Sequence, residues 1–286
     1  MYFSRGYYEK EEKFFPDIEK IEEIYDILLK FPQRDKMQFF SIEEHNEIAE
    51  KGNLTEASMY LFSDAFNLLK FFFYTNIYKP TNITKGLIQA YNSQNYLVWI
   101  ILSRSLLEYS AIFHYYKKKI DELNIQSTSI KFSELQEFEK ILLKFVHGTR
   151  FNWQSLTQGK IEELPKESSE NYTSAVNVLT AIEHLKKRDS RFKDVKFAYD
   201  MLSDFSHPNM ASHTTVVEMP ESEEKSCIVN INPSNLRGEF IMIATIPTVQ
   251  LSLGNILEMI QSTGQLIKFW LERIDSSEQI EIDFNA

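Results

Sequence analysis

The sequence predicts a mainly α-helical protein, built as a helical bundle with a small β-hairpin near residues 213–231. The 286 residues include only 8 glycines and 8 prolines, so few positions can interrupt regular structure. Hydrophobic side chains make up 43% of the chain and charged side chains 25%, a balance typical of a globular protein with a core. Apolar residues recur every three or four positions nearly to residue 210, which is the period of an amphipathic helix.

Two helices are expected near the N-terminus. Residues 17–31 carry apolar side chains at helical spacing, and Pro32 ends this helix because proline cannot continue it. A shorter polar helix is expected over residues 42–51. There, Ser41 and Glu44 form a capping-box pattern, in which each side chain can bond to the backbone of the other.

The next segment predicts the longest helices. Residues 54–78 are rich in Phe and Leu on most sides, which predicts a helix covered on several faces and ended by Pro80. Residues 82–123 fit either one very long helix or two helices joined near Asn92 and Ser93. Side chains at these two positions compete for backbone hydrogen bonds and interrupt the pattern.

Three further helices are expected before residue 210. Ser133 and Gln136 form a second capping box, and the helix that they open closes at His147. Residues 171–187 and residues 195–205 show the same helical spacing of apolar side chains.

The residue pattern changes after about residue 210, where β-branched residues become frequent. β-branched runs on either side of an acidic turn predict the hairpin of residues 213–231, and residues 251–274 predict a long amphipathic helix. We expect an N-terminal helical extension over residues 1–52 and a helical bundle over residues 53–286, with the hairpin inserted at residues 213–246.

Charge, cysteine content and missing motifs exclude several classes of function. With 31 Lys and Arg against 41 Asp and Glu, the net charge is −10, so any RNA contact must be local. The single Cys227 suits a cytoplasmic protein without disulfides. We identify no secretory signal and no apolar run long enough to span a bilayer, and therefore expect no membrane segment. Signatures of phosphate-binding loops, zinc proteases, nucleophile elbows and kinases are absent from the sequence, so we expect no metal and no cofactor.

Two places on the predicted helices carry polar residues that suit chemistry. The first is Arg104 with Glu108, which share a helix stripe with apolar residues and so draw charge toward the interior. An intrahelical or buried structural ion pair explains the same two residues.

The second place is the end of the helix over residues 195–205. Tyr199, Ser203 and His207 lie on one face, and a Pro-Asn pair ending in Asn209 terminates the helix beside the imidazole. Histidine exchanges a proton near neutral pH, so His207 is the best acid/base candidate. A histidine that only caps its own helix C-terminus is the competing interpretation.

A local basic segment precedes this helix. It contains six basic and two acidic residues, and it is where a polyanion would bind to an otherwise acidic chain. A solvated connection between helices accounts for the same charges. The basic residues are Lys186, Lys187, Arg188, Arg191, Lys193 and Lys196.

Two motifs together resemble a known group of bacterial proteins. The sequence Arg-Ser-Leu-Leu-Glu at 104–108, followed by Tyr-x-x-Leu-Ser-x-x-x-His-Pro-Asn at 199–209, resembles the uncharacterised HEPN-like and Abi-like α-helical family over about residues 80–215. The resemblance implies a helical bundle that forms a homodimer. It also implies a role in anti-phage or toxin–antitoxin defence, in which many HEPN proteins act as metal-independent RNases.

The chain departs from the family pattern at one position. Active HEPN RNases carry an Arg five positions before the His, whereas Leu202 stands there in this chain. An RNase function therefore requires that Arg104, on another helix, supply the cation that stabilises the phosphorane.

The resemblance gives each candidate residue an expected role. His207 would act as acid/base, Arg104 as phosphate-binding cation, Glu108 as the group that orients Arg104, and Ser203 as a hydrogen-bond partner of His207 or of the substrate. The expected substrate contacts are Tyr199, Asn209, Lys187, Arg188 and Arg191. The alternative is a non-enzymatic interaction or sensor module of a defence system, which binds a cognate antitoxin or another partner protein.

Overall fold

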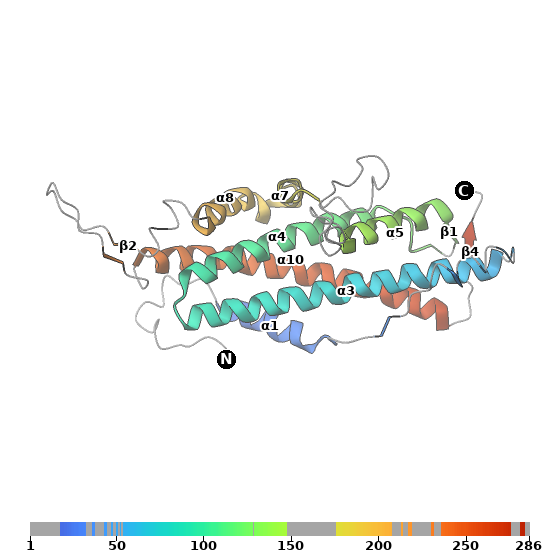
Figure 1. Ribbon diagram of the computed structural model, residues 1–286, viewed down its shortest axis with the longest axis horizontal. Coiled ribbons are helices and arrows are strands. Elements are labelled where there is room, and N and C mark those ends of the chain that lie inside the picture. Colours follow the sequence, from blue (N-terminus) through green and yellow to red (C-terminus); the bar gives the residue numbers. More distant parts are fainter. Residues whose placement is uncertain are drawn as a thin grey trace, which may run out of the picture. The chain divides into compact units, whose positions relative to one another are not determined.

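The computed structural model is mainly α-helical, as the sequence predicts. It describes residues 18–32, 36–37, 43–44, 47, 50, 52, 54–127, 129–147, 176–207, 213, 217–218, 230–231, 236–275 and 281–283. Within this part of the chain the helices are α1 (Glu19–Lys30), α3 (Leu54–Asn92), α4 (Tyr96–Asp121), α5 (Phe132–His147), α7 (Val178–Lys186), α8 (Val195–Ser206) and α10 (Leu236–Asp275), with a single 3-10 turn, η2 (Ser190–Phe192) (Figure 1).

Two short pairs of strands complete the described structure. β1 (Ser129–Lys131) runs parallel to β4 (Glu281–Asp283). β2 (Val217–Glu218) pairs antiparallel with β3 (Asn230–Ile231), which confirms the base of the expected hairpin. The residues between β2 and β3 lie outside the described part of the chain.

The chain divides into two compact units. The first unit comprises Met1–Gln33, Ile77–His114 and Val178–Glu258, and the second comprises Arg34–Asn76, Tyr115–Asn177 and Met259–Ala286. The helices α3, α4 and α10 each contribute residues to both units. The expected boundary at residue 52 stays a prediction.

Close approach of helices organises the core of the first unit. Trp99 of α4 is fully buried, and its indole N–H donates a hydrogen bond of 2.8 Å to Thr245 Oγ1 of α10. A Cβ at Gly86 of α3 would lie 2.8 Å from the side chain of Leu102, and a Cβ at Gly238 would collide with a ring of α4. Glycine at these two positions therefore lets neighbouring backbones approach one another closely.

An aromatic cluster around Trp270 organises the core of the second unit. The Trp270 ring lies 4.5 Å from the ring of Phe62 and 5.3 Å from the ring of Phe138. Its indole N–H donates to the backbone oxygen of Ile125 at 3.0 Å, so the polar atom of this buried side chain is satisfied. This cluster joins residues of α3, α5 and α10.

The expected end of a helix at Pro80 is wrong, because α3 continues through it to Asn92. Proline in a helix interior loses a backbone hydrogen bond and costs about 3 kcal/mol. Burial of Ile77 and Leu87 on either side offsets part of this cost. The Thr84 hydroxyl also donates to the Pro80 carbonyl at 2.7 Å.

The structure also decides three other helix boundaries. Of the two alternatives for residues 82–123, two separate helices are correct, since α3 and α4 are joined by residues 93–95. The segment 236–246, expected in the hairpin insertion, is instead the start of α10. Of the expected helix of residues 171–187, α7 covers Val178–Lys186, residues 176–177 are not helical, and residues 171–175 lie outside the described residues. Most of the expected helix of residues 42–51 also lies outside the described residues.

Two helices are long and apolar enough to cross a membrane by length and composition. They are Tyr96–Asp121 and Gly238–Ile274, and 50% of each apolar window is buried inside the protein. Core helices of soluble proteins have the same properties, because both of their faces are covered by other elements. The expected absence of a membrane segment therefore stays a prediction.

Candidate functional site

Arg104 and Glu108 form the part of the candidate site that α4 provides. The Arg104 Nε–H donates to Glu108 Oε1 at 2.9 Å, and the two side chains are 23% and 26% exposed. Residues four apart lie on one face of a helix, so this ion pair follows directly from the local sequence. Glu108 uses the Nε edge of the guanidinium and leaves the two Nη groups to other partners.

Residues at the end of α8 provide the other part. Within the first unit, α8 lies beside α4 (Figure 1). Arg104 Nη1 donates to Ser206 Oγ at 2.9 Å and lies 3.2 Å from His207 Nε2. His207 caps α8 in an extended conformation, and its backbone N–H donates to the Ser203 carbonyl at 3.1 Å. The chain therefore leaves the helix at the residue whose imidazole meets Arg104.

The contact with Arg104 defines the hydrogen-bonding role that is open to His207 Nε2. A guanidinium only donates hydrogen bonds, so His207 Nε2 accepts from it only when that nitrogen carries no proton. His207 is exposed and Arg104 is partly exposed, so the pair is open to water and is not sealed in the interior. A water-accessible imidazole beside a fixed cation can exchange a proton with a bound substrate.

The ring of Tyr199 contacts Arg104 and is largely shielded from solvent. The Arg104 guanidinium carbon lies 5.7 Å from the centre of the Tyr199 ring, within range of a cation–π interaction. Tyr199 is only 9% exposed, so its ring is poorly placed for the substrate contact that the sequence suggests.

The serine that contacts Arg104 is Ser206, not the expected Ser203. The Ser203 hydroxyl is buried and has no hydrogen-bond partner among the described residues, so the expected bond to His207 is not formed. Ser206, which the sequence analysis did not select, accepts from Arg104 and donates to the Ser203 carbonyl at 3.1 Å. The helical spacing that selects Ser203 also places Ser206 three residues further along the same face.

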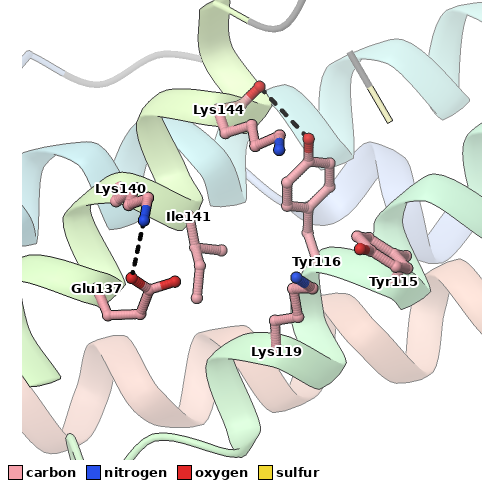
Figure 2. Close-up of a pocket in the computed structure, with 7 residues that line it drawn as sticks. All are labelled: Tyr115, Tyr116, Lys119, Glu137, Lys140, Ile141 and Lys144. Carbon is pink, nitrogen blue, oxygen red and sulfur yellow. Dashed lines mark hydrogen bonds and ion pairs between the residues drawn. The ribbon is translucent and has the colours of Figure 1, made fainter. Parts of the chain in front are cut away.

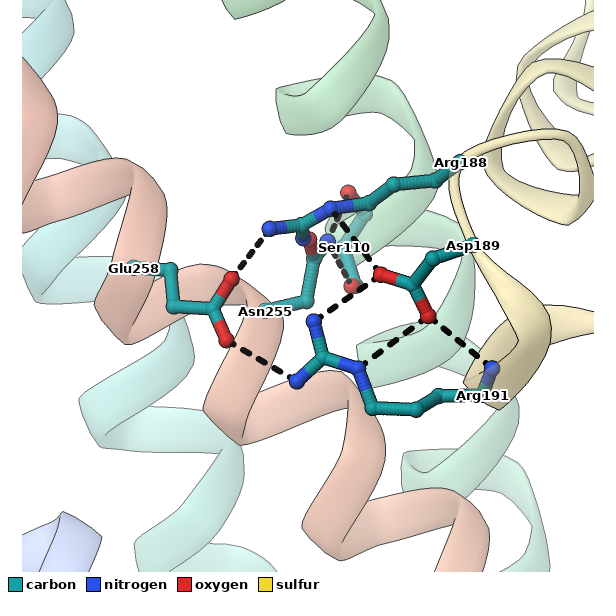
Figure 3. A network of polar contacts seen from close by, with 6 residues as sticks. All are labelled: Ser110, Arg188, Asp189, Arg191, Asn255 and Glu258. Carbon is teal, nitrogen blue, oxygen red and sulfur yellow. Dashed lines mark hydrogen bonds and ion pairs between the residues drawn. The ribbon is translucent and has the colours of Figure 1, made fainter.

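The basic segment before α8 is largely engaged within the chain. Arg188 pairs with Glu258 of α10 and donates to the side-chain oxygen of Asn255 (Figure 3). The Asn255 amide in turn donates to Ser110 Oγ of α4 at 2.7 Å. Asn255 and Ser110 are 2% and 0% exposed, so this network connects the loop before α8 to two core helices.

Arg191 takes part in the same network. Its Nη2 lies 2.9 Å from Asp189 Oδ2, and its Nη1 lies 3.2 Å from Glu258 Oε1. The hydrogen bonds from Arg191 hold the pKa of Asp189 below its ordinary value. Arg188 and Arg191 therefore have acidic partners within the chain, which argues against the expected role in binding a polyanion. Lys187 is exposed.

One expected substrate contact and the question of a metal site remain. Asn209 lies outside the described residues. No group of three or more His, Cys, Asp or Glu side chains that could hold a metal occurs among the residues that the structure describes.

Comparisons with known proteins do not extend this description. Neither the family models, nor the curated proteins, nor the solved structures contain a significant match to the chain. The functional argument therefore depends on the geometry of the cluster formed by Arg104, Glu108, Ser206 and His207, which we call the Arg104 cluster.

Proposed function

We propose that the Arg104 cluster is the centre of a metal-independent endoribonuclease of the HEPN-like type, acting in bacterial anti-phage or toxin–antitoxin defence. One observation carries the proposal. A guanidinium on α4 and an imidazole at the end of α8 lie 3.2 Å apart, at a position open to water, although 103 residues separate them in the chain.

The reaction needs a cation, a base and an acid near one phosphodiester. The 2′-hydroxyl oxygen of the RNA forms a bond to phosphorus, and the bond from phosphorus to the 5′ oxygen breaks. The products are a 2′,3′-cyclic phosphate and a 5′-hydroxyl. A base removes the 2′-hydroxyl proton, and an acid protonates the leaving oxygen. The cation stabilises the negative charge that develops on the phosphorane.

Arg104 suits the role of the cation. Its Nε and Nη1 bond to Glu108, Ser206 and His207, while Nη2 has no acceptor among the described residues. The two Nη2 N–H groups can therefore bind phosphate oxygens. Leu202, at the position where HEPN RNases carry their Arg, is fully buried, so α4 is the source of the cation in this proposal.

His207 suits the transfer of a proton. When the guanidinium turns toward the phosphate, Nε2 is released and can accept the proton of the 2′-hydroxyl. One imidazole provides only one of the two proton-transfer groups. We therefore expect a homodimer in which His207 of a second copy acts as the acid, since a two-fold axis brings equivalent residues together.

Cleavage of RNA by the purified full chain in the presence of a chelator tests the proposal. We expect His207→Ala to lower the rate about a hundredfold or more, the range of a lost acid/base group. Arg104→Lys retains the charge but not the planar fork, and we expect it to retain more activity than Arg104→Gln. His184→Ala, an exposed histidine of α7 outside the cluster, is the matched control and should cleave like the wild type.

The products distinguish this chemistry from contaminating nuclease. We expect products that end in a 2′,3′-cyclic phosphate. RNA with a 2′-deoxy residue at the cleaved position should not be cleaved, because it lacks the attacking hydroxyl. Equal cleavage by wild type and folded His207→Ala would discard the catalytic role.

Large exposed apolar side chains favour a second candidate, a non-enzymatic interaction module. Phe197 of α8 and Phe240 of α10 are 71% and 70% exposed, and side chains of this kind contribute strongly to protein interfaces. In this case the Arg104 cluster only holds α4 and α8 together. Copurification with a co-expressed antitoxin or other neighbouring protein, abolished by Phe197→Ser and unaffected by His207→Ala, would support it.

A further inference from the structure

A pocket lies between α4 and α5 in the second unit, and nothing in the proposed ribonuclease uses it. Its volume is about 160 Å³. Figure 2 shows the side chains that line it, three from α4 and four from α5. They are Tyr115, Tyr116, Lys119, Glu137, Lys140, Ile141 and Lys144.

The charge of the pocket is opposite to that of the chain. Three ammonium groups face one carboxylate, whereas the whole protein carries a net charge of −10. Glu137 lies 3.4 Å from Lys140 and is paired with it. Lys119 and Lys144 have no carboxylate partner among the described residues. Two cations of the pocket are therefore available to an anionic ligand.

Two tyrosines of α4 in the pocket wall contact these two lysines. The hydroxyl of Tyr116, a residue that is 4% exposed, donates to the backbone oxygen of Lys144 at 3.4 Å and so connects α4 to α5. The Lys119 ammonium lies 5.0 Å from the centre of the Tyr115 ring, within cation–π range. Burial, with the neighbouring Tyr115, raises the pKa of Tyr116 to about 12, so this phenol adds no negative charge at neutral pH.

We propose that this pocket binds the diphosphate group of a small molecule, either inorganic pyrophosphate or a nucleoside diphosphate. Lysine ammonium groups are strong point charges for phosphate oxygens, and two of them on adjacent helices can bind a ligand with more than one phosphoryl group. A cavity of roughly 150 Å³ holds a group the size of benzene. The pocket therefore accommodates a phosphoryl group or a diphosphate but not a whole nucleotide, and a nucleoside would extend into solvent.

Titration calorimetry of the full chain with pyrophosphate and, separately, with ADP tests the proposal and distinguishes the two sources. We expect saturable binding, weakened about tenfold or more by Lys144→Gln and by Lys119→Gln, because each removes a charge-assisted hydrogen bond. Lys144→Arg should bind better than Lys144→Gln. The matched control is Lys118→Gln, which removes the same charge from an exposed neighbour on α4 outside the pocket and should bind like the wild type.

Chemical footprinting tests the proposal on the wild-type protein, so its result does not depend on whether a variant folds. Pyrophosphate should protect Lys119 and Lys144 from acetylation while Lys118 stays reactive. The absence of saturable binding, an equal loss in Lys118→Gln, or protection by RNA but not by pyrophosphate or ADP would overturn the proposal. These readouts involve no RNA cleavage, so their outcome is independent of the test of His207.

Discussion

Arg104 uses three of its five N–H groups within the chain, one for Glu108 and two, both on Nη1, for Ser206 and His207. At the scale of single residues, this distribution is what the proposed role of Arg104 as a phosphate-binding cation requires. A structural arginine is buried and fully bonded, whereas Arg104 is 23% exposed and keeps Nη2 available.

Removal of Arg104 should therefore have a small effect on stability. We expect Arg104→Ala to lower the free energy of unfolding by about 1–2 kcal/mol, because water can solvate the partly exposed Glu108 and Ser206 that it leaves. Loss of one partner of a fully buried ion pair costs about 3–5 kcal/mol. Urea denaturation provides the measurement, and a loss in that larger range would identify the cluster as a structural ion pair.

Tyr116 should make the protein sensitive to alkaline pH. Burial raises the pKa of its phenol to about 12, above the ordinary tyrosine value of about 10. Between these values the unfolded state binds fewer protons than the folded state, so stability falls as the pH rises. The loss attributable to this group is up to about 2–3 kcal/mol. We expect Tyr116→Phe to show a flatter decline in denaturation midpoint between about pH 10 and 12, and parallel profiles would contradict the assignment.

At the scale of elements, the long helices tolerate residues that usually interrupt helices. α3 contains Pro80, and α10 contains Pro247 and several glycines. Tertiary packing compensates for these residues, and the compensation differs from one position to the next. Two glycines of α10 within the first unit make this difference measurable.

Gly238 and Gly254 should respond to alanine in opposite directions. A Cβ at Gly238 would collide with the ring of Tyr96, whereas a Cβ at Gly254 would meet nothing within 4 Å. We expect Gly238→Ala to destabilise the protein by about 1–3 kcal/mol through overpacking. Gly254→Ala should stabilise it by up to about 1 kcal/mol, because alanine favours the helix and restricts the unfolded chain. Thermal melts of both variants provide the test. An unchanged or raised melting temperature for Gly238→Ala would show that the packing at Gly238 is loose, and a lowered one for Gly254→Ala would contradict the expectation for that site.

At the scale of the whole molecule, the hydropathy of two helices is compatible with a membrane, whereas the net charge of the chain favours water. α4 and α10 are apolar enough to cross a membrane, yet half of each apolar window is buried inside the protein. The chain also carries a net charge of −10, which favours solubility and repels anionic lipid surfaces.

We propose that α4 and α10 are core helices and do not cross a membrane. After lysis without detergent and ultracentrifugation, the protein should stay in the supernatant, because α4 carries the charged residues Arg104 and Glu108 near its middle, and charges are costly inside a bilayer. Recovery in the membrane pellet that resists high salt and requires detergent would refute this expectation.

The sequence alone determined those features that depend on neighbours along the chain. The helical class follows from the three- and four-residue spacing of apolar side chains. The local hydrogen-bonding chemistry of Asn92 and Ser93 marked a possible interruption there, and the structure decided between one helix and two. The Arg104–Glu108 pair and the position of His207 at a helix end are equally local.

Tertiary structure alone decided which distant groups meet. Ser206 rather than Ser203 bonds to Arg104, because only the packing of α8 against α4 sets which hydroxyl faces the guanidinium. Arg188 has its acidic partner, Glu258, 70 residues away, so two of the six basic residues of the segment, Arg188 and Arg191, belong to a network with acidic partners within the chain. The helix also continues through Pro80, where buried contacts on either side offset part of a local penalty, and these contacts depend on tertiary packing.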